Sequence, residues 1–214
     1  TNSSQTIIDC LMKEANKYAV DIRMNKEVKG IYTDAGKWSH IMKDDGIMPA
    51  DFICIASGGY PKLLQYDWLK KAEHTIEEPV PSLFTFNMPG NNITSLMGVT
   101  VENAQVKIVG SKLTESGPLL ITHWGMSGPA VLKLSAWGAR ELASANYHFK
   151  ILVNWIPEFN ENSLREQFQK LRFNLATQKI VNRNPFALPN RLWECLMIQS
   201  GINIELRWAD LPAK

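Results

Sequence analysis

A histidine and a serine stand four residues apart in the segment THWGMSGPA, which covers residues 122–130. His123 could exchange a proton, and Ser127 could act as a nucleophile or hold an anion. Gly125 and Gly128 flank the serine, and glycines permit tight turns and close approach of a ligand to the backbone. The pattern leaves three interpretations open: a nucleophile elbow, an anion-binding turn, or a tight connection between a strand and a helix.

The nucleophile elbow is the weakest of the three interpretations. That motif reads G-x-S-x-G between a strand and a helix, and Pro129 stands here in place of the last glycine. His148, the histidine that would complete a triad, has no distinctive surroundings. A helix that begins at Ser127, with Gly128 in its first turn, fits better. Its free amides could bind a phosphate, a carboxylate or a polarised carbonyl, or the serine could simply cap its own helix.

A second candidate site is the tripeptide Ser57-Gly58-Gly59. It follows the continuous apolar run 52–56, which predicts a central strand of a parallel sheet with both faces covered. Small residues after such a strand let a ligand approach the backbone amides. The sequence contains neither a G-x-G-x-x-G pattern nor a Walker A loop, so this signal is weak on its own.

The elements that would position these sites follow from periodicity and turn residues. We expect a helix capped by Ser3 or Ser4, strands within 21–34 and 38–42, a turn at 43–46, and a helix after Pro61. Further β-like runs cover 83–86, 99–101, 106–109, 119–122 and 149–155, with turns predicted at 89–91 and 116–118. A capping box predicts a helix from Ser163, and another follows Pro189 and stops at Gly201.

These elements predict a mixed α/β or α+β chain with a domain boundary near Pro79. The first domain, 1–78, reads as an α/β arrangement. The second domain, 79–214, reads as a small antiparallel β-barrel or sandwich at about 79–157 and a helical part at about 158–214.

The composition of the chain argues against several classes of function. Of the 214 residues, 45% are hydrophobic and 21% are charged, and the net charge of +2 argues against nucleic-acid binding. No run of about 18 apolar residues predicts a membrane helix, and no signal peptide opens the sequence, so we expect a cytoplasmic protein.

We interpret Cys10, Cys54 and Cys195 as reduced core residues. Without a CxxC pair or paired histidines, we expect no metal site.

Three segments together resemble the aminoacetone-oxidase-like family of FAD-dependent flavoproteins: ASGGYPK, EEPVPSLFTF and GPLLITHWGMSGPAVLKLSAWGAR. They are similar to that family's ATGG-type segment, its PSL segment that opens an inserted domain, and its LLxTHxGxSGPAxLxxS motif. The order and spacing agree over nearly the whole chain. Serine replaces the usual threonine in the first segment, which keeps a hydroxyl.

The resemblance implies FAD as cofactor, a small-molecule substrate and oxidoreductase chemistry in an intact relative. It implies that Ser57, Gly58 and Gly59 pass close to FAD. It also implies that Gly125, Ser127 and Gly128 face the flavin or the substrate, with His123 as a proton-transfer residue.

Family members also carry an N-terminal G-x-G-x-x-G loop and a C-terminal glycine-rich segment, and neither pattern is present here. We therefore expect 1–78 to be an incomplete Rossmann-like FAD domain and 79–214 to be a complete inserted domain. By itself the chain should neither retain FAD nor turn over a substrate, and open sheet edges would favour a homo-oligomer. The alternative is a stand-alone barrel-plus-helix binding module for a protein or RNA partner.

Overall fold

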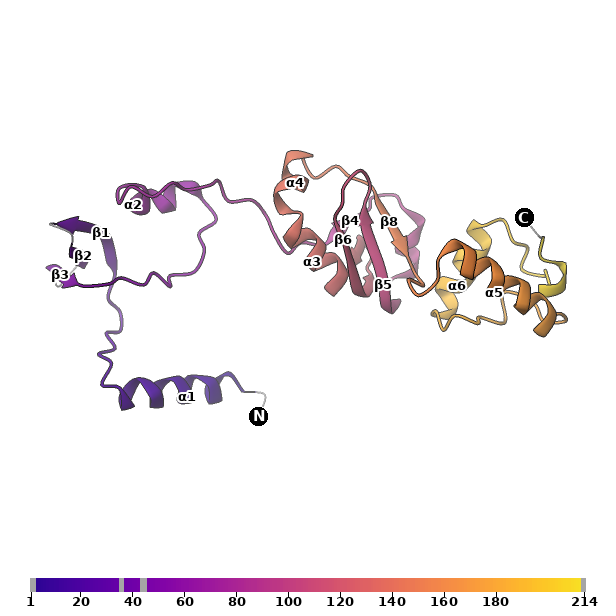
Figure 1. The fold of residues 1–214 in the computed structure, drawn as a ribbon, viewed down its shortest axis with the longest axis horizontal. Helices are drawn as coiled ribbons and strands as arrows, with labels where there is room; N and C mark the ends of the chain where they lie inside the picture. The colour runs from indigo at the N-terminus through magenta and orange to yellow at the C-terminus, as the bar shows by residue number, and fades with distance from the viewer. Residues whose placement is uncertain (1–2, 35–36, 43–45, 213–214) are drawn as a thin grey trace. The chain divides into compact units, whose positions relative to one another are not determined.

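The computed structural model describes residues 3–34, 37–42 and 46–212. The chain divides into two compact units, Thr1–Pro79 and Val80–Lys214. Each unit is a mixture of helices and antiparallel strands (Figure 1), so the predicted mixed α+β class is confirmed. Among the described residues, no helix is long and apolar enough to cross a membrane.

The first unit begins with a capped helix and continues into a small sheet. Its elements are α1 (Ser4–Lys17), β1 (Val28–Asp34), β2 (Lys37–Met42), β3 (Gly46–Ala50), the 3₁₀ helix η1 (Leu63–Tyr66) and α2 (Asp67–Lys70). Ser3 caps α1, because its Oγ accepts a hydrogen bond from the backbone N–H of Gln5 at 3.2 Å. The sheet is an antiparallel meander in the order β1-β2-β3. The predicted first helix and the strand at 38–42 are confirmed, and the turn predicted at 43–46 falls largely outside the described residues.

One prediction for this unit is wrong, and two are right in the type of element but not in its extent. Residues 52–60 form neither a strand nor a helix, and the side chain of Phe52 is 92% exposed. A central parallel strand needs a hydrogen-bonded neighbour on each edge, and the sheet of this unit ends at Ala50. The first strand begins only at Val28, and the helix expected after Pro61 is reduced to the short η1 and α2.

The first unit buries little apolar surface. Among its described side chains, Ile31 is the single buried hydrophobic one. One face of α1 carries four exposed apolar side chains, those of Ile7, Ile8, Leu11 and Met12. Cys10 and Cys54 are exposed and Cys195 is half-buried, so the prediction that the cysteines are core residues is wrong for the first two. The core of this molecule lies in the second unit.

The second unit is built on a curled, five-stranded antiparallel sheet in the order β4-β7-β6-β5-β8. Its strands are β4 (Phe86–Asn87), β5 (Thr100–Ile108), β6 (Thr114–Ile121), β7 (Gly125–Ser127) and β8 (Ile151–Asn154). The β-like runs predicted a small antiparallel barrel or sandwich; the sheet is antiparallel and forms a half-barrel, with β4 and β8 as its two edges. The 3₁₀ helix η2 (Asn92–Leu96) connects β4 to β5.

Two details of the predicted strands change. The runs at 99–101 and 106–109 belong to the single strand β5, whose pairing with β6 is irregular between Val101 and Ala104. The turn predicted at 116–118 lies inside β6, where Gly117 pairs with Ala104. The β5–β6 turn instead contains Gly110, whose φ of 84° is a conformation that favours glycine. The turn predicted at 89–91 is confirmed.

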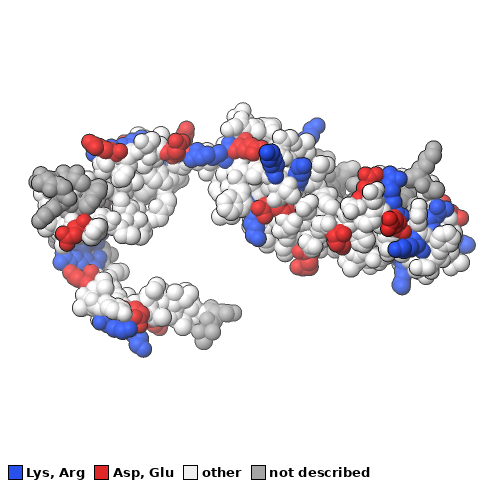
Figure 2. Space-filling view, viewed as in Figure 1, with Lys and Arg blue, Asp and Glu red and all other residues white. Residues whose placement is uncertain are grey.

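The helix α3 (Pro129–Trp137) packs against β5, β6 and β7 of the sheet, and α4 (Ala139–Ser144) follows it and packs against α3. Val131 and Leu134 of α3 are fully buried, as are Val106 of β5 and Leu119 of β6. All four belong to one apolar cluster that also reaches the C-terminal helices. On the face shown in Figure 2, acidic and basic side chains are interspersed rather than separated by sign.

The C-terminal part of this unit is helical, as predicted. It contains α5 (Glu161–Asn174), α6 (Asn190–Gln199) and the 3₁₀ helix η3 (Trp208–Asp210). α5 begins earlier than the sequence indicated, because Asn160 is its cap and Ser163 is the third helical residue of the capping box. α6 follows Pro189 and ends before Gly201, whose φ is 75°, so both of its predicted boundaries are confirmed.

Candidate functional site

The segment THWG forms the tip of the hairpin that joins β6 to β7. The N–H of Thr122 donates to the carbonyl O of Gly125 at 2.8 Å, and the N–H of Gly125 donates back to the carbonyl O of Thr122 at 3.3 Å. The Oγ1 of the buried Thr122 accepts from the same N–H at 3.1 Å. His123 and Trp124 are therefore the two turn residues of a tight hairpin.

His123 and Trp124 are both exposed at this tip. Their rings meet edge to face, with centroids 4.3 Å apart and planes at 81°. Trp124 remains 42% exposed, and its carbonyl O accepts a hydrogen bond from the N–H of Met88 at 2.7 Å. The tip is thus bonded to the segment that follows β4, and the imidazole can exchange a proton with a bound molecule.

Gly125 is required by the close approach of β4 to β7. Its φ is 155°, and a Cβ placed on it would overlap the carbonyl O of Phe86 and lie 3.0 Å from the N of Met88. Both of those atoms belong to the backbone, so neither can move away as a flexible side chain would. Gly125 therefore holds the hairpin tip against the end of β4.

Gly128, rather than Ser127, precedes the helix. Its φ is 100°, and a Cβ there would lie 2.6 Å from the carbonyl O of Pro118. Ser127 is the last residue of β7, where it pairs with Leu120. The prediction that Ser127 caps the helix is wrong, because the chain stays extended through this residue. An extended strand also excludes the strained serine turn of a nucleophile elbow.

The helix that follows starts with Pro129 as its first residue, as the sequence indicated. Proline suits this position because its missing N–H has no partner within the helix. No side chain caps α3. The structure therefore places His123 at the tip of the β6–β7 hairpin, Gly125 and Ser127 in β7, and Gly128 at the start of α3.

Ser57, Gly58 and Gly59 lie in the other unit, in an exposed stretch without regular structure. Gly58 has a φ of 77°, and a Cβ placed on either glycine would have no atom within 4 Å. Another molecule could therefore approach the backbone of both glycines without meeting a side chain.

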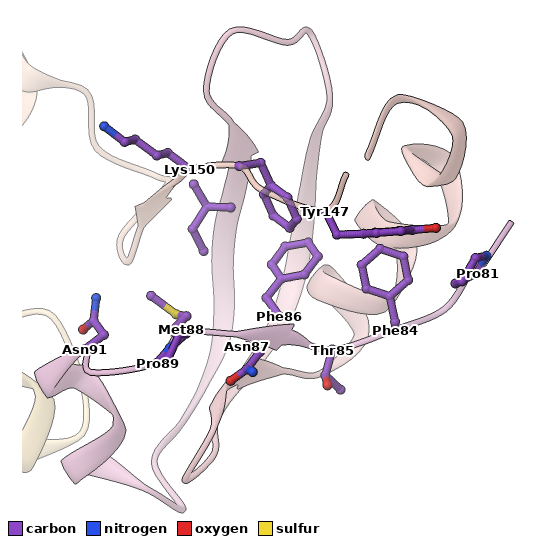
Figure 3. A pocket seen from close by; sticks show the side chains of 12 residues that line it. Pro81, Phe84, Thr85, Phe86, Asn87, Met88, Pro89, Asn91, Tyr147 and Lys150 are labelled. Atoms are coloured by element: carbon purple, nitrogen blue, oxygen red, sulfur yellow. The ribbon is translucent and has the colours of Figure 1, made fainter. Parts of the chain in front are cut away.

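A groove that the sequence reading missed lies between the two edge strands of the half-barrel (Figure 3). It has a volume of about 670 Å³, and its walls come from the β4 region and from the segment that leads into β8. The described residues that line it are Pro81, Phe84, Thr85, Phe86, Asn87, Met88, Pro89, Asn91, Tyr147, Phe149, Lys150 and Ile151. The signal in the sequence was a pair of alternating aromatic tripeptides, FTF at 84–86 and YHF at 147–149.

Within the described part of the chain, no group of three or more His, Cys, Asp or Glu side chains is arranged to hold a metal ion. Two places in the second unit carry polar side chains that could contact a ligand. The hairpin tip carries His123 and Trp124, and the groove is lined by Asn87, Asn91 and Lys150.

Comparison with known proteins identifies the family to which this chain belongs. The family described as "HI0933-like protein barrel and H2TH domain" matches residues 80–214. The chain is 30% identical over 206 residues to the ribosomal RNA dihydrouridine synthase of Escherichia coli (strain K12). That similarity covers 91% of this chain and 48% of the relative, so the chain spans about half the length of the relative that it matches. The chain belongs to the HI0933-like family, which lies within the FAD-dependent oxidoreductase superfamily.

Proposed function

We propose that this chain is the central segment of an FAD-dependent oxidoreductase that forms dihydrouridine in ribosomal RNA. The observation that carries the proposal is the 30% identity with the ribosomal RNA dihydrouridine synthase, which extends over both units of this chain. The resemblance to aminoacetone-oxidase-like flavoproteins supports the same flavin chemistry. A uridine within RNA replaces the small-molecule substrate that this resemblance implied, and it also replaces the expectation, drawn from the net charge of +2, that the chain does not bind nucleic acid.

The reaction adds two hydrogens to a carbon–carbon double bond. Dihydrouridine differs from uridine by one hydride and one proton, added to the two carbons of the C5–C6 bond. FAD in its reduced form, when bound, supplies the hydride with its electron pair. The protein then has to orient the uracil ring, exclude water and provide the proton.

His123 is the proposed proton donor. It lies at the tip of a short hairpin whose position is held by the bonds of Thr122 and Gly125 and by the bond from Met88 to Trp124. An imidazole is the side chain that most often donates or accepts a proton in general acid–base catalysis, and this one is exposed to a bound molecule. Gly125, Ser127 and Gly128 are proposed to face the flavin or the uracil, with the two glycines fixing the backbone on which His123 stands.

Ser57, Gly58 and Gly59 are proposed to pass beside FAD. The positive φ of Gly58 and the open space beside both glycines support this role, because a backbone without Cβ atoms can lie against a flat or anionic group. A loop of this kind positions a cofactor but supplies little of the pyrophosphate binding that a G-x-G-x-x-G turn provides.

A chimera tests the proposal. This chain would replace the matching stretch of the Escherichia coli synthase, in cells that lack the native enzyme, and dihydrouridine in ribosomal RNA would be measured by mass spectrometry of nucleosides. We expect the modification to return. A second chimera carrying His123→Gln should retain its flavin absorbance but form far less dihydrouridine.

The chimera also separates the parts of the proposal. A purified chimera that contains flavin but forms no dihydrouridine would contradict the substrate assignment and leave the flavoprotein assignment standing. A folded chimera, checked by circular dichroism, that contains no flavin would contradict the cofactor assignment. In that case the stand-alone binding module would be the better description of this chain.

A further inference from the structure

We propose that the groove between β4 and β8 binds an unpaired nucleotide of single-stranded RNA. The base would lie against the aromatic rings of the groove, and a phosphate would lie against Lys150. The proposal rests on the proposed function for its choice of RNA as the ligand. It adds a binding site in the second unit, separate from the hairpin tip.

The groove exists because the half-barrel does not close. β4 hydrogen-bonds only to β7, and β8 hydrogen-bonds only to β5, so each leaves one edge unpaired in the described sheet. Aromatic rings stand between the two edges in place of backbone bonds. Phe86 meets Phe149 with centroids 4.9 Å apart, and Phe84 lies at the same level as Tyr147 (Figure 3).

The pair formed by Phe84 and Tyr147 is the exposed part of the aromatic wall, and its position is fixed by ring packing and by one backbone hydrogen bond. The centroids of Phe84 and Tyr147 lie 5.7 Å apart, with their planes at 81°. Tyr147 has a φ of 58°, a left-handed conformation that aromatic residues rarely adopt. The bond from its N–H to the carbonyl O of Leu142, at 2.8 Å, holds this conformation. The ring remains 42% exposed, so it offers a surface on which a base can stack.

Polar groups lie at the other end of the groove. Figure 3 shows Asn91 on one side and Lys150 on the other, both on the far side of Phe86 from Tyr147. The Oδ1 of Asn91 accepts from the N–H of Ile93 at 2.9 Å, so its amide NH₂ is the end that can donate to a base carbonyl such as those of uracil. Lys150 is the one charged residue among the described lining residues.

This combination favours a nucleotide over an added peptide strand. An extended peptide would bind through backbone hydrogen bonds to the edge of β4 or β8. The described lining includes four aromatic side chains, those of Phe84, Phe86, Tyr147 and Phe149, and ring surfaces favour a base over an extended backbone. An aromatic wall with one cation and no carboxylate matches the requirements of a single-stranded nucleic-acid site, in which bases stack and phosphates are neutralised.

The test measures binding of a fluorescein-labelled oligouridine RNA to the full chain by fluorescence anisotropy at several salt concentrations. Lys150→Gln should make the slope of log affinity against log salt shallower by about 0.7, the value for one phosphate contact on a single strand. Lys133→Gln is the matched control, because Lys133 is exposed on α3 and does not line the groove. The control should bind as the unmodified chain does.

A second pair of variants examines stacking. Tyr147→Leu should weaken binding roughly 5- to 150-fold, the range for loss of one base–aromatic contact. Tyr18→Leu is its control, because Tyr18 is an exposed tyrosine in the first unit. Circular dichroism of each variant would show whether the fold is kept.

Crosslinking locates the site without relying on a variant. Oligouridine that contains 4-thiouridine should crosslink to the peptide that carries Tyr147 and Lys150. The proposal is overturned if the chain does not bind single-stranded RNA, if the groove variants bind as their controls do, or if crosslinks fall only elsewhere. A dimer formed through the groove, detected by sedimentation and unaffected by RNA, would overturn it as well.

These outcomes are independent of the test for the proposed function. The chimera reports turnover, whereas anisotropy and crosslinking report binding by this chain alone. Turnover without binding in the groove would reject the groove and keep the function. Binding in the groove without turnover would reject the function and keep the groove.

Discussion

Ser135 of α3 is hydrogen-bonded to the backbone of Phe84, at the start of the half-barrel. Its fully buried Oγ accepts from the N–H of Phe84 at 2.9 Å and donates to the carbonyl O of Leu132 at 2.9 Å. This one hydroxyl connects the segment that enters β4 to the helix that follows the hairpin tip. It therefore fixes the start of the aromatic wall of the groove, at Phe84, against α3.

Ser135→Ala should destabilise the second unit by about 1–3 kcal/mol, because the N–H of Phe84 would lose its acceptor in a dry environment. Urea unfolding followed by tryptophan fluorescence measures the change. Ser144→Ala is the control, since Ser144 is exposed on α4 and its Oγ donates to the carbonyl O of Arg140 at 3.0 Å. A change in the control within about 0.5 kcal/mol is expected; equal effects of both variants would contradict the bridging role.

Gly125→Ala should cost more stability than Gly110→Ala. Both glycines have a positive φ, and that conformation alone costs an alanine about 1–3 kcal/mol. A Cβ at position 110 meets no atom within 4 Å, whereas one at position 125 overlaps the carbonyl O of Phe86. Thermal unfolding measures the melting temperature of each variant. The decrease for Gly110→Ala reports backbone strain alone, and the additional decrease for Gly125→Ala reports steric overlap with the backbone of Phe86. If the two melting temperatures fell equally, the close approach of β4 would not be the reason for Gly125.

His123→Gln should leave the stability of the chain unchanged within about 0.5 kcal/mol, because the side chain is exposed at a hairpin tip. In the chimera it should lower dihydrouridine formation by about 10²- to 10⁴-fold, the contribution of a general acid. His148→Gln provides the comparison, since His148 is exposed and its Nδ1 lies 2.7 Å from the carbonyl O of Asn146. Full activity of the His123 variant would assign proton transfer to another group.

Arg191→Ala should loosen the packing of α6 against the half-barrel. The guanidinium of Arg191 donates to the carbonyl O of Ser95 at 2.8 Å and to that of Met97 at 3.3 Å. Because the side chain is exposed, we expect a loss of about 1 kcal/mol, measured by urea unfolding. Arg183→Ala, at another exposed arginine of the same part, should have a smaller effect. The reverse order would show that these two bonds do not stabilise the unit.

The isolated chain should not retain FAD. The Ser57–Gly58–Gly59 loop can lie beside a flavin, but this sequence contains no G-x-G-x-x-G turn to bind a pyrophosphate. An absorbance scan of the purified chain, after incubation with FAD and desalting, measures retention. A flavin band that survives desalting would mean that other residues of this chain supply the missing contacts.

The sequence by itself determined the local elements of this protein. The apolar spacing of α1, the proline before α6 and the glycine after it are readable because helix periodicity and end signals involve neighbours in the chain. The β-like runs of the second half likewise predicted a small antiparallel barrel or sandwich, and the structure has an antiparallel half-barrel. The start of α5 was misplaced by a few residues, because Asn160 and Ser163 can each serve as a cap and only the fold selects one of them.

The tertiary structure decided what the motifs do. Whether the apolar run at 52–56 becomes a strand depends on pairing with another strand, and this run pairs with neither outer strand of the described sheet, β1 or β3. The need for Gly125 comes from the backbone of Phe86, and the groove comes from rings at 84–86 and 147–149 that meet across the open barrel. Such relationships join segments far apart in the sequence, and packing rather than local pattern brings them together.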